Sequence, residues 1–220
     1  MIITIPTYLL QILMGVLIVC VLFGCSMLVG DRGPATVHYS FDAVLSALPR
    51  ASDSALLASG LLNQPTIYVA PIKSAAGFDS NKIVYIRQQF QPNYYRLGQW
   101  VDAPAVMLEP IVISALQQVG LNASNHLSTA KSEQFQLNID ILRLQQEFFS
   151  QPSKVHFTIR MRLIDQSSGA LLVDREFNKL IPSATEDTYG GVVAANAAVR
   201  AVLDELATLC RSELALRHAQ

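Results

Sequence analysis

The residues with the clearest chemistry lie near the N-terminus, where Leu22–Cys25, with the sequence Leu-Phe-Gly-Cys, follows a long apolar run. This pattern is typical of a bacterial lipobox, in which a cysteine thiol takes up a diacylglycerol and a small residue precedes the cleaved peptide bond. Leu22 and Gly24 suit these positions, and Cys25 is the predicted site of lipid attachment. We therefore expect residues 1–24 to be a lipoprotein signal peptide, removed from the mature chain. Cys25 would then be an N-acylated, diacylglycerol-bearing N-terminus.

Two features depart from a typical export signal. Phe23 is bulky for its position, and no Lys or Arg precedes Arg32. Cys20 is a weaker candidate for modification because Val19 precedes it. One alternative is an uncleaved membrane anchor, since Leu9–Val29 is nearly continuous apolar sequence and a spanning helix needs about 20 residues. Another is a buried core helix, but both leading interpretations place the protein on a membrane.

The remaining cysteines and histidines predict neither a disulfide framework nor a metal site. After removal of the signal, Cys25 is consumed by lipid and Cys210 has no partner. Cys210 falls on an apolar helical face, which favours a buried, inert thiol. The chain has no CxxC or HExxH motif. Its four histidines are scattered: His38, His126, His156 and His218.

No pattern in the sequence indicates an enzyme. There is no GxSxG nucleophile motif and no Gly-rich phosphate loop, and the pair Gly190-Gly191 is too short to be one. Glu186 and Asp187 look like acids at a helix N-terminus, where they complement the helix dipole, rather than a catalytic pair. We therefore predict a protein without catalytic activity and without a cofactor other than the lipid on Cys25.

Length and charge limit the number of domains and the kinds of partner to be expected. The roughly 195 residues after the signal are enough for one domain with a substantial core. The chain has 16 Lys and Arg against 17 Asp and Glu, and no basic cluster that would follow a phosphate backbone. Nucleic acid is therefore not an expected partner.

The first half of the chain predicts short strands and one helix. β-Branched and aromatic residues indicate strands at Thr36–Tyr39, Thr66–Ile72, Lys82–Arg87 and Tyr94–Leu97, the last two joined as a hairpin. Residues 43–63 are expected to form a loop or two short helical turns. A helix is expected from Pro104 to Val119, with Pro110 as a source of irregularity.

The second half has the clearest periodicity. Apolar and polar residues alternate from Phe135 to Ile141, and the alternation slips at Leu142, which predicts a strand with a bulge. A strand at Val155–Leu163 and the segment Leu171–Val173 predict a long antiparallel hairpin. The last helix is expected over about Tyr189–Leu214, packed across the sheet.

Two groups of side chains are candidates for recognition. Arg160 and Arg162 could bind an anionic lipid or an acidic partner, although solvated surface charges are the default interpretation. Tyr94, Tyr95 and Trp100 are candidates for a partner or subunit interface, because aromatic anchors dominate such contacts. The alternative is that these three rings pack between helix and sheet.

Several of these segments together carry a family resemblance that covers most of the mature chain. They are the lipobox at Cys25, the strands Ile67–Ile72 and Ile83–Arg87, the Tyr94-Tyr95 pair, and Trp100–Pro104 leading into the helix that ends near Leu116. In these features the chain resembles the ABC-type transport auxiliary lipoproteins, the family that includes the lipoprotein component of the paraquat-inducible operon.

The resemblance implies an α/β fold: a single three-layer domain with a mixed sheet, over residues 36–216, behind a lipidated tether at residues 25–35. It also implies a non-catalytic auxiliary role in an MCE-type lipid transport system that contains an MCE protein, a permease and an ATPase, with a homo-oligomer as a further expectation. Ser26 is not the aspartate that retains lipoproteins in the inner membrane, which favours the periplasmic face of the outer membrane over an inner-membrane anchor. The alternative function is a structural or assembly lipoprotein of another envelope complex.

Overall fold

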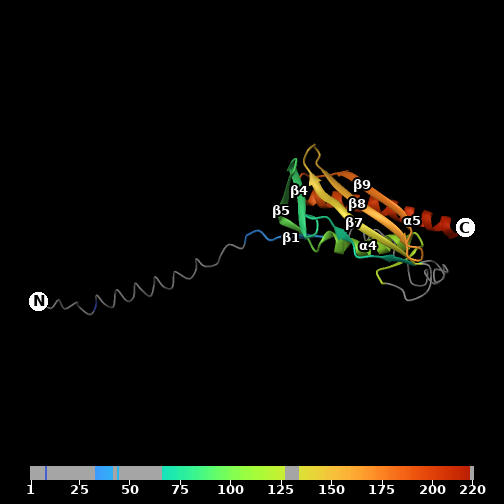
Figure 1. The fold of residues 1–220 in the computed structure, drawn as a ribbon. Coiled ribbons are helices and arrows are strands. Elements are labelled where there is room, and N and C mark those ends of the chain that lie inside the picture. Colours follow the sequence, from blue (N-terminus) through green and yellow to red (C-terminus); the bar gives the residue numbers. More distant parts are fainter. Residues whose placement is uncertain (1–7, 9–32, 42–43, 45–65, 127–133, 219–220) are drawn as a thin grey trace. The chain divides into compact units, whose positions relative to one another are not determined.

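A computed structural model describes Tyr8 and residues 33–41, 44, 66–126 and 134–218 (Figure 1). The chain divides into two units, residues 1–35 and 36–220, and the elements described below belong to the second. Apart from Tyr8, the predicted signal peptide lies outside the described residues, as do Cys25 and nearly all of the predicted loop at 43–63.

The second unit is a mixed sheet of nine strands with two helices. The strands are β1 (Val37–Tyr39), β2 (Thr66–Val69), β3 (Lys73–Ser74), β4 (Lys82–Gln88), β5 (Gln91–Trp100), β6 (Asn122–Ser124), β7 (Gln134–Glu147), β8 (Lys154–Asp165) and β9 (Leu171–Pro182). The helices are α4 (Pro104–Gln118) and α5 (Thr188–His218). The predicted α/β class, the mixed sheet and the flanking helices are confirmed.

The long strand β7 is the central strand of the sheet and pairs with four other strands. Along one edge it pairs with β8 in antiparallel register, and β8 pairs in turn with β9. Along its other edge it takes β2, β3 and β4 one after another, all parallel to it. β4 continues the sheet through β5, and β1 lies parallel to β5. The predicted long hairpin is therefore β8–β9, and β7 and β8 form a second one.

Two local expectations can be compared directly with the strands. The register of β7 shifts between Ile141 and Arg143, which confirms the slip predicted at Leu142. The strand predicted over Thr66–Ile72 is shorter in the structure: β2 ends at Val69, and the separate strand β3 begins only after Ile72. Pro71 lies between them, and because proline has no amide N–H it cannot donate to β7 at that point.

The core forms where the apolar residues of β7 and β8 meet the helices. Leu137, Ile141 and Phe157 are buried there, as are Val199 and Leu206 of α5. The two helices contact each other, so the described residues form one sheet layer and one helical layer. The third layer implied by the resemblance is not found among them. Among the described residues, neither helix is long and apolar enough to cross a membrane.

The alternate residues of β8 face the other side of the sheet and carry charge. The guanidinium of Arg160 donates two hydrogen bonds to Asp174, at 2.7 and 2.6 Å, and that of Arg162 lies 2.6 Å from a carboxylate oxygen of Asp140. Both arginines already have acidic partners within the sheet. Their arrangement therefore favours the structural interpretation over binding of an external anion.

Candidate functional site at two hairpin tips

The three predicted interface aromatics lie in different surroundings. Trp100 is only 2% exposed, and its ring centroid is 4.9 Å from that of Phe41. Tyr95 is half-buried against Tyr85, with 4.6 Å between the ring centroids. Tyr94 is 43% exposed. Trp100 and Tyr95 thus have the packing role that was the alternative prediction, and Tyr94 presents its ring to solvent.

Tyr95 takes part in a buried hydrogen-bond cluster centred on Gln146. The Tyr95 hydroxyl donates to Gln146 Oε1 at 2.8 Å, and Gln146 Nε2 donates to Ser153 Oγ at 2.9 Å and to Ser183 Oγ at 3.3 Å. Burial raises the pKa of Tyr95 to about 12, against the opposing charge of Arg87. The phenol therefore stays protonated at neutral pH and acts as a donor. The cluster joins β5, β7 and the segments that flank β8 and β9.

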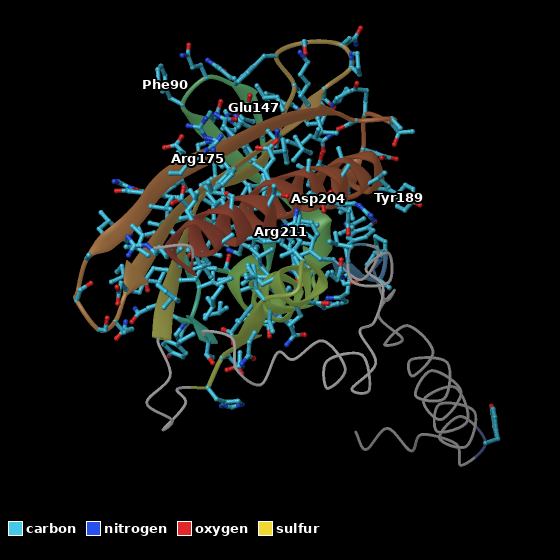
Figure 2. All side chains as sticks on the ribbon, turned by 90° about the vertical axis from the view of Figure 1, so that its right-hand side faces the viewer. Phe90, Glu147, Arg175, Tyr189, Asp204 and Arg211 are labelled. Carbon is cyan, nitrogen blue, oxygen red and sulfur yellow. The ribbon has the colours of Figure 1, made fainter. Side chains whose placement is uncertain are left out.

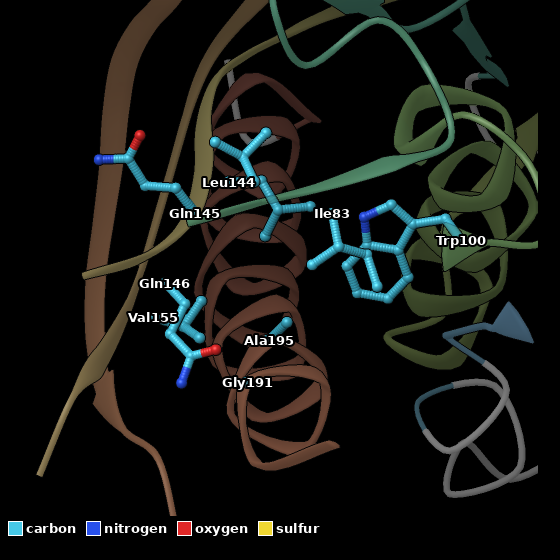
Figure 3. A pocket seen from close by; sticks show the side chains of 9 residues that line it. Ile83, Trp100, Leu144, Gln145, Gln146, Val155, Gly191 and Ala195 are labelled. Atoms are coloured by element: carbon cyan, nitrogen blue, oxygen red, sulfur yellow. The ribbon is translucent and has the colours of Figure 1, made fainter. Parts of the chain in front are cut away.

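The first turn of α5 lies directly against this cluster. A Cβ atom added at Gly191 would be 2.2 Å from Gln146 Oε1, closer than atoms can approach without a shift. Figure 3 shows the Gln146 amide directed toward Gly191, with Trp100 and Ile83 across a small cavity. Gly191, which looked uninformative in the sequence, is needed for the helix to reach β7.

The acids that precede α5 fix where the helix begins. Asp187 Oδ1 accepts a hydrogen bond from the backbone N–H of Gly190 at 2.8 Å and one from the Thr185 hydroxyl at 2.7 Å. These bonds lower the pKa of Asp187, and their geometry is that of a helix N-cap. Glu186 accepts from the backbone N–H of Ser153 at 2.8 Å. The prediction that both acids belong to the helix N-terminus is confirmed for Asp187.

The turn between β4 and β5 presents an unusual residue to solvent. Gln88 and Gln91 close the hairpin, and the turn between them contains Phe90, which is 90% exposed with φ of 67°. Non-glycine residues seldom adopt this left-handed conformation, and a bulky one does so at a cost. A strained, exposed aromatic residue motivates the hypothesis of a functional contact.

A second exposed phenylalanine lies beside the first turn. Phe149, in the turn between β7 and β8, is 56% exposed. The backbone N–H of Phe148 donates to Ile86 O at 2.9 Å, which places this turn next to the end of β4. Both turns lie at the same end of the sheet in Figure 1, and Figure 2 shows Phe90 directed away from the body. We call Phe90 and Phe149 the aromatic tips.

The surroundings of the aromatic tips are neutral to basic. The turn segments 88–93 and 148–153 contain no Asp or Glu. Glu147 lies at the end of β7, and its Oε1 atom is 3.0 Å from His156 Nδ1. The Arg87 guanidinium lies 4.1 Å from the centroid of the Phe148 ring. Within the part of the chain that the structure describes, neither Arg87 nor Lys154 forms an ion pair with a carboxylate.

Sequence reasoning did not single out the aromatic tips. The available signal was an apolar ring inside a polar turn, in the segments Gln-Phe-Gln-Pro at 89–92 and Phe-Phe-Ser-Gln-Pro at 148–152. The alternation of apolar and polar residues along a strand does not predict such residues, because they lie beyond the last paired position of each hairpin.

Comparison with solved structures identifies the class of fold. The domain is similar to protein XCC0632 from Xanthomonas campestris, of the DUF330 family, with a TM-score of 0.62 and 20% identity over 71% of this chain and 89% of that one. An uncharacterized protein gives the same TM-score at 15% identity, over 80% of this chain and 99% of that one. The PelC dodecamer from Paraburkholderia phytofirmans has a TM-score of 0.40 at 12% identity, over 64% of this chain and 88% of that one.

The family follows from the sequence comparison. The family described as the ABC-type transport auxiliary lipoprotein component matches residues 47–207, and the chain belongs to it. The resemblance drawn from the strand and helix motifs is thereby confirmed. No curated protein matches the sequence.

Proposed function

We propose that this protein is a membrane-anchored periplasmic lipoprotein that serves, without catalysis, as an auxiliary component of an MCE-type lipid transport system. The observation that carries the proposal is the family match over 47–207, which includes strands from both edges of the sheet and most of both helices. In this proposal residues 1–24 are the signal peptide, 25–35 the tether and 36–216 the auxiliary domain.

The lipid on Cys25 would hold the domain at a membrane surface. Each buried CH₂ of an acyl chain contributes about 0.8 kcal/mol, and more than one chain is needed for stable anchoring, so three chains on one cysteine would give a stable attachment. With Ser26 as the second residue, we place the anchor in the outer membrane, with the inner membrane as the alternative. The domain would then act in the periplasm.

The small cavity beside Trp100 is too narrow to hold a lipid. The cavity drawn in Figure 3, between β4, β7 and α5, measures about 10 Å³. That is roughly the room for one water molecule, whereas ligand pockets enclose about 300–1,000 Å³. An acyl chain cannot occupy this cavity. The role that we propose for the domain in transport is to hold and orient partner proteins.

The proposed partners are the MCE protein with its permease and ATPase, together with further copies of this chain. Of the three aromatic candidates from the sequence, Tyr94 is the one whose ring is available to a protein, with the ammonium of Lys82 4.8 Å from its centroid. Tyr95 and Trp100 would support such an interface from beneath, because Tyr95 is hydrogen-bonded to Gln146 of β7 and Trp100 packs on Phe41.

The attachment site is tested by intact-mass measurement and membrane fractionation of the full chain expressed in a bacterial host. The native protein is expected to begin at a triacylated Cys25 and to stay in the membrane fraction after a high-salt wash. The Cys25→Ser variant is expected to retain its signal and lack acyl chains. Cys20→Ser and Cys210→Ser are matched controls that should be processed like the native chain. Acylation at Cys20, or an unmodified native N-terminus, would refute the proposed anchor.

A further inference from the structure

We propose that the aromatic tips, Phe90 and Phe149, insert into the interfacial region of the phospholipid bilayer to which the protein is tethered. This inference rests on the proposed lipid anchor and adds a second contact with the same membrane. It assigns an orientation to the domain: the end of the sheet that carries the two turns faces the lipid, and the end that carries the β8–β9 turn faces away.

The surface around the aromatic tips is uncharged. Two exposed phenylalanine rings project from adjacent turns whose remaining residues are Gln, Pro, Asn, Ser and the half-buried Phe148. Burying a carboxylate at a lipid interface is costly, and neither turn has one. The nearest acids are engaged inward, Glu147 with His156 and Glu186 with the Ser153 amide.

Two cations lie beside the turns. Arg87 and Lys154 are exposed, Arg87 next to the β4–β5 turn and Lys154 next to the β7–β8 turn. Among the described residues, no carboxylate forms an ion pair with either of them. Cations near a bilayer are attracted to anionic headgroups, and long basic side chains can keep their charge in water while their stems lie along the interface. Apolar rings at the tip with unpaired cations behind them therefore suit a lipid surface that contains anionic lipid.

The chain enters the domain from the end of the sheet that carries the aromatic tips. β1 runs parallel to β5, with Val37 opposite Gly98, and β5 starts at the turn that carries Phe90. The chain before Val37 therefore approaches β1 from the end of the sheet that carries the aromatic tips. Gly98 is about seven residues along β5 from the turn, or roughly 23 Å at the rise of a strand.

The tether is long enough to make use of this direction. Residues 25–35 can span at most about 40 Å when fully extended. This exceeds the roughly 23 Å that separates the start of β1 from the level of the turn. A lipidated Cys25 and the aromatic tips can therefore reach the same membrane, with several residues of the tether to spare.

The test uses tryptophan as a depth probe in the full lipidated chain. The protein has one tryptophan, Trp100, and it is buried, so it supplies an internal reference that lipid cannot reach. Phe90→Trp and Phe149→Trp each add a second indole while keeping an aromatic ring at the tip. Leu171→Trp is the matched control. Leu171 is similarly exposed, but it lies beside the β8–β9 turn, at the end of the strands away from the aromatic tips.

Each protein is reconstituted in vesicles of phosphatidylethanolamine and phosphatidylglycerol that contain phosphatidylcholine brominated on its acyl chains. We expect Phe90→Trp and Phe149→Trp to lose emission relative to unbrominated vesicles, with more loss when the bromine lies near the headgroup than near the chain end. Native protein and Leu171→Trp should show no loss. The quenching should weaken as phosphatidylglycerol is withdrawn or salt is raised.

Two results would overturn the inference. Absence of quenching at both tips would show that the rings are not in lipid and would leave them available to a protein partner instead. Equal quenching of Leu171→Trp would show that the domain has no preferred orientation. Circular dichroism and the emission of Trp100 confirm that each variant is folded. The intact mass of each sample reports acylation of Cys25 separately, so failure of the anchor is distinguished from failure of the tip contact.

Discussion

Substitution of Gly191 by alanine offers a quantitative test of how the hairpin ends are held. The new methyl group would be placed 2.2 Å from Gln146 Oε1 and 2.9 Å from its Cδ. Gln146 is buried, so its amide cannot simply turn into solvent. Either the helix moves away from β7 or Gln146 gives up its hydrogen bonds to Tyr95, Ser153 and Ser183.

The expected cost can be worked out from these contacts. Leaving a buried polar group unsatisfied costs about 1–3 kcal/mol, and three donors and acceptors depend on Gln146. Alanine returns up to about 1 kcal/mol, because glycine is a poor residue within a helix. We therefore expect Gly191→Ala to lower the free energy of unfolding by roughly 2–4 kcal/mol.

The assay is a double-mutant cycle with Gln146→Ala, followed by urea denaturation with the fluorescence of Trp100 as the signal. In the Gln146→Ala background the added methyl group meets no amide, so Gly191→Ala should be neutral or stabilise by up to about 1 kcal/mol. An exposed control, Ala197→Gly, reports the helix propensity alone. If Gly191→Ala costs the same with and without Gln146, the proposed steric conflict is wrong.

Three further results are expected. Burial raises the pKa of Tyr95 to about 12 from its ordinary 10.0, so Tyr95 ionises at lower pH in the unfolded chain than in the folded one. The free energy of unfolding should therefore fall as the pH rises from about 10 to 12. Denaturation measured across that range should show a less steep fall for Tyr95→Phe than for the native chain. Burial likewise raises the pKa of the Cys210 thiol to about 12, so a thiol reagent should label it only at the rate of unfolding, and rapid labelling of the folded protein would contradict its placement in the core. Phe90→Gly should leave the free energy of unfolding unchanged or raise it by up to about 1 kcal/mol, because φ is 67° at this position and glycine adopts that conformation readily. Phe157→Ala in the core should lower the free energy of unfolding by about 3–5 kcal/mol. A large loss for Phe90→Gly would show that its ring packs in the fold.

The elements predicted well are those whose periodicity is set by one buried face. The alternation from Phe135 to Ile141 and from Val155 to Leu163 gave β7 and β8, because every second residue enters the core. The slip at Leu142 was visible because a bulge moves the apolar residues to the other phase. The length of α5 was slightly underestimated, since its last turn is largely exposed and has no apolar repeat.

The candidate site was less accessible to sequence reasoning. The residue type of Trp100 fits either an interface or packing between helix and sheet, and its burial and its contact with Phe41 show that it belongs to the core. The role of Gly191 depends on Gln146, which is 45 positions away in the chain and becomes a neighbour only through the packing of α5 on β7. The aromatic tips lie in turns, where neither strand nor helix periodicity applies.

The measurement that tests the central claim most directly is affinity purification of the full chain from detergent-extracted membranes, with intact-mass analysis of the bait and identification of what accompanies it. The account predicts a bait that begins at triacylated Cys25 and carries an MCE protein, with less of that protein recovered by the Cys25→Ser variant. A bait that retains residues 1–24 and brings down no transport component, or brings down a secretion or assembly complex instead, would contradict the account.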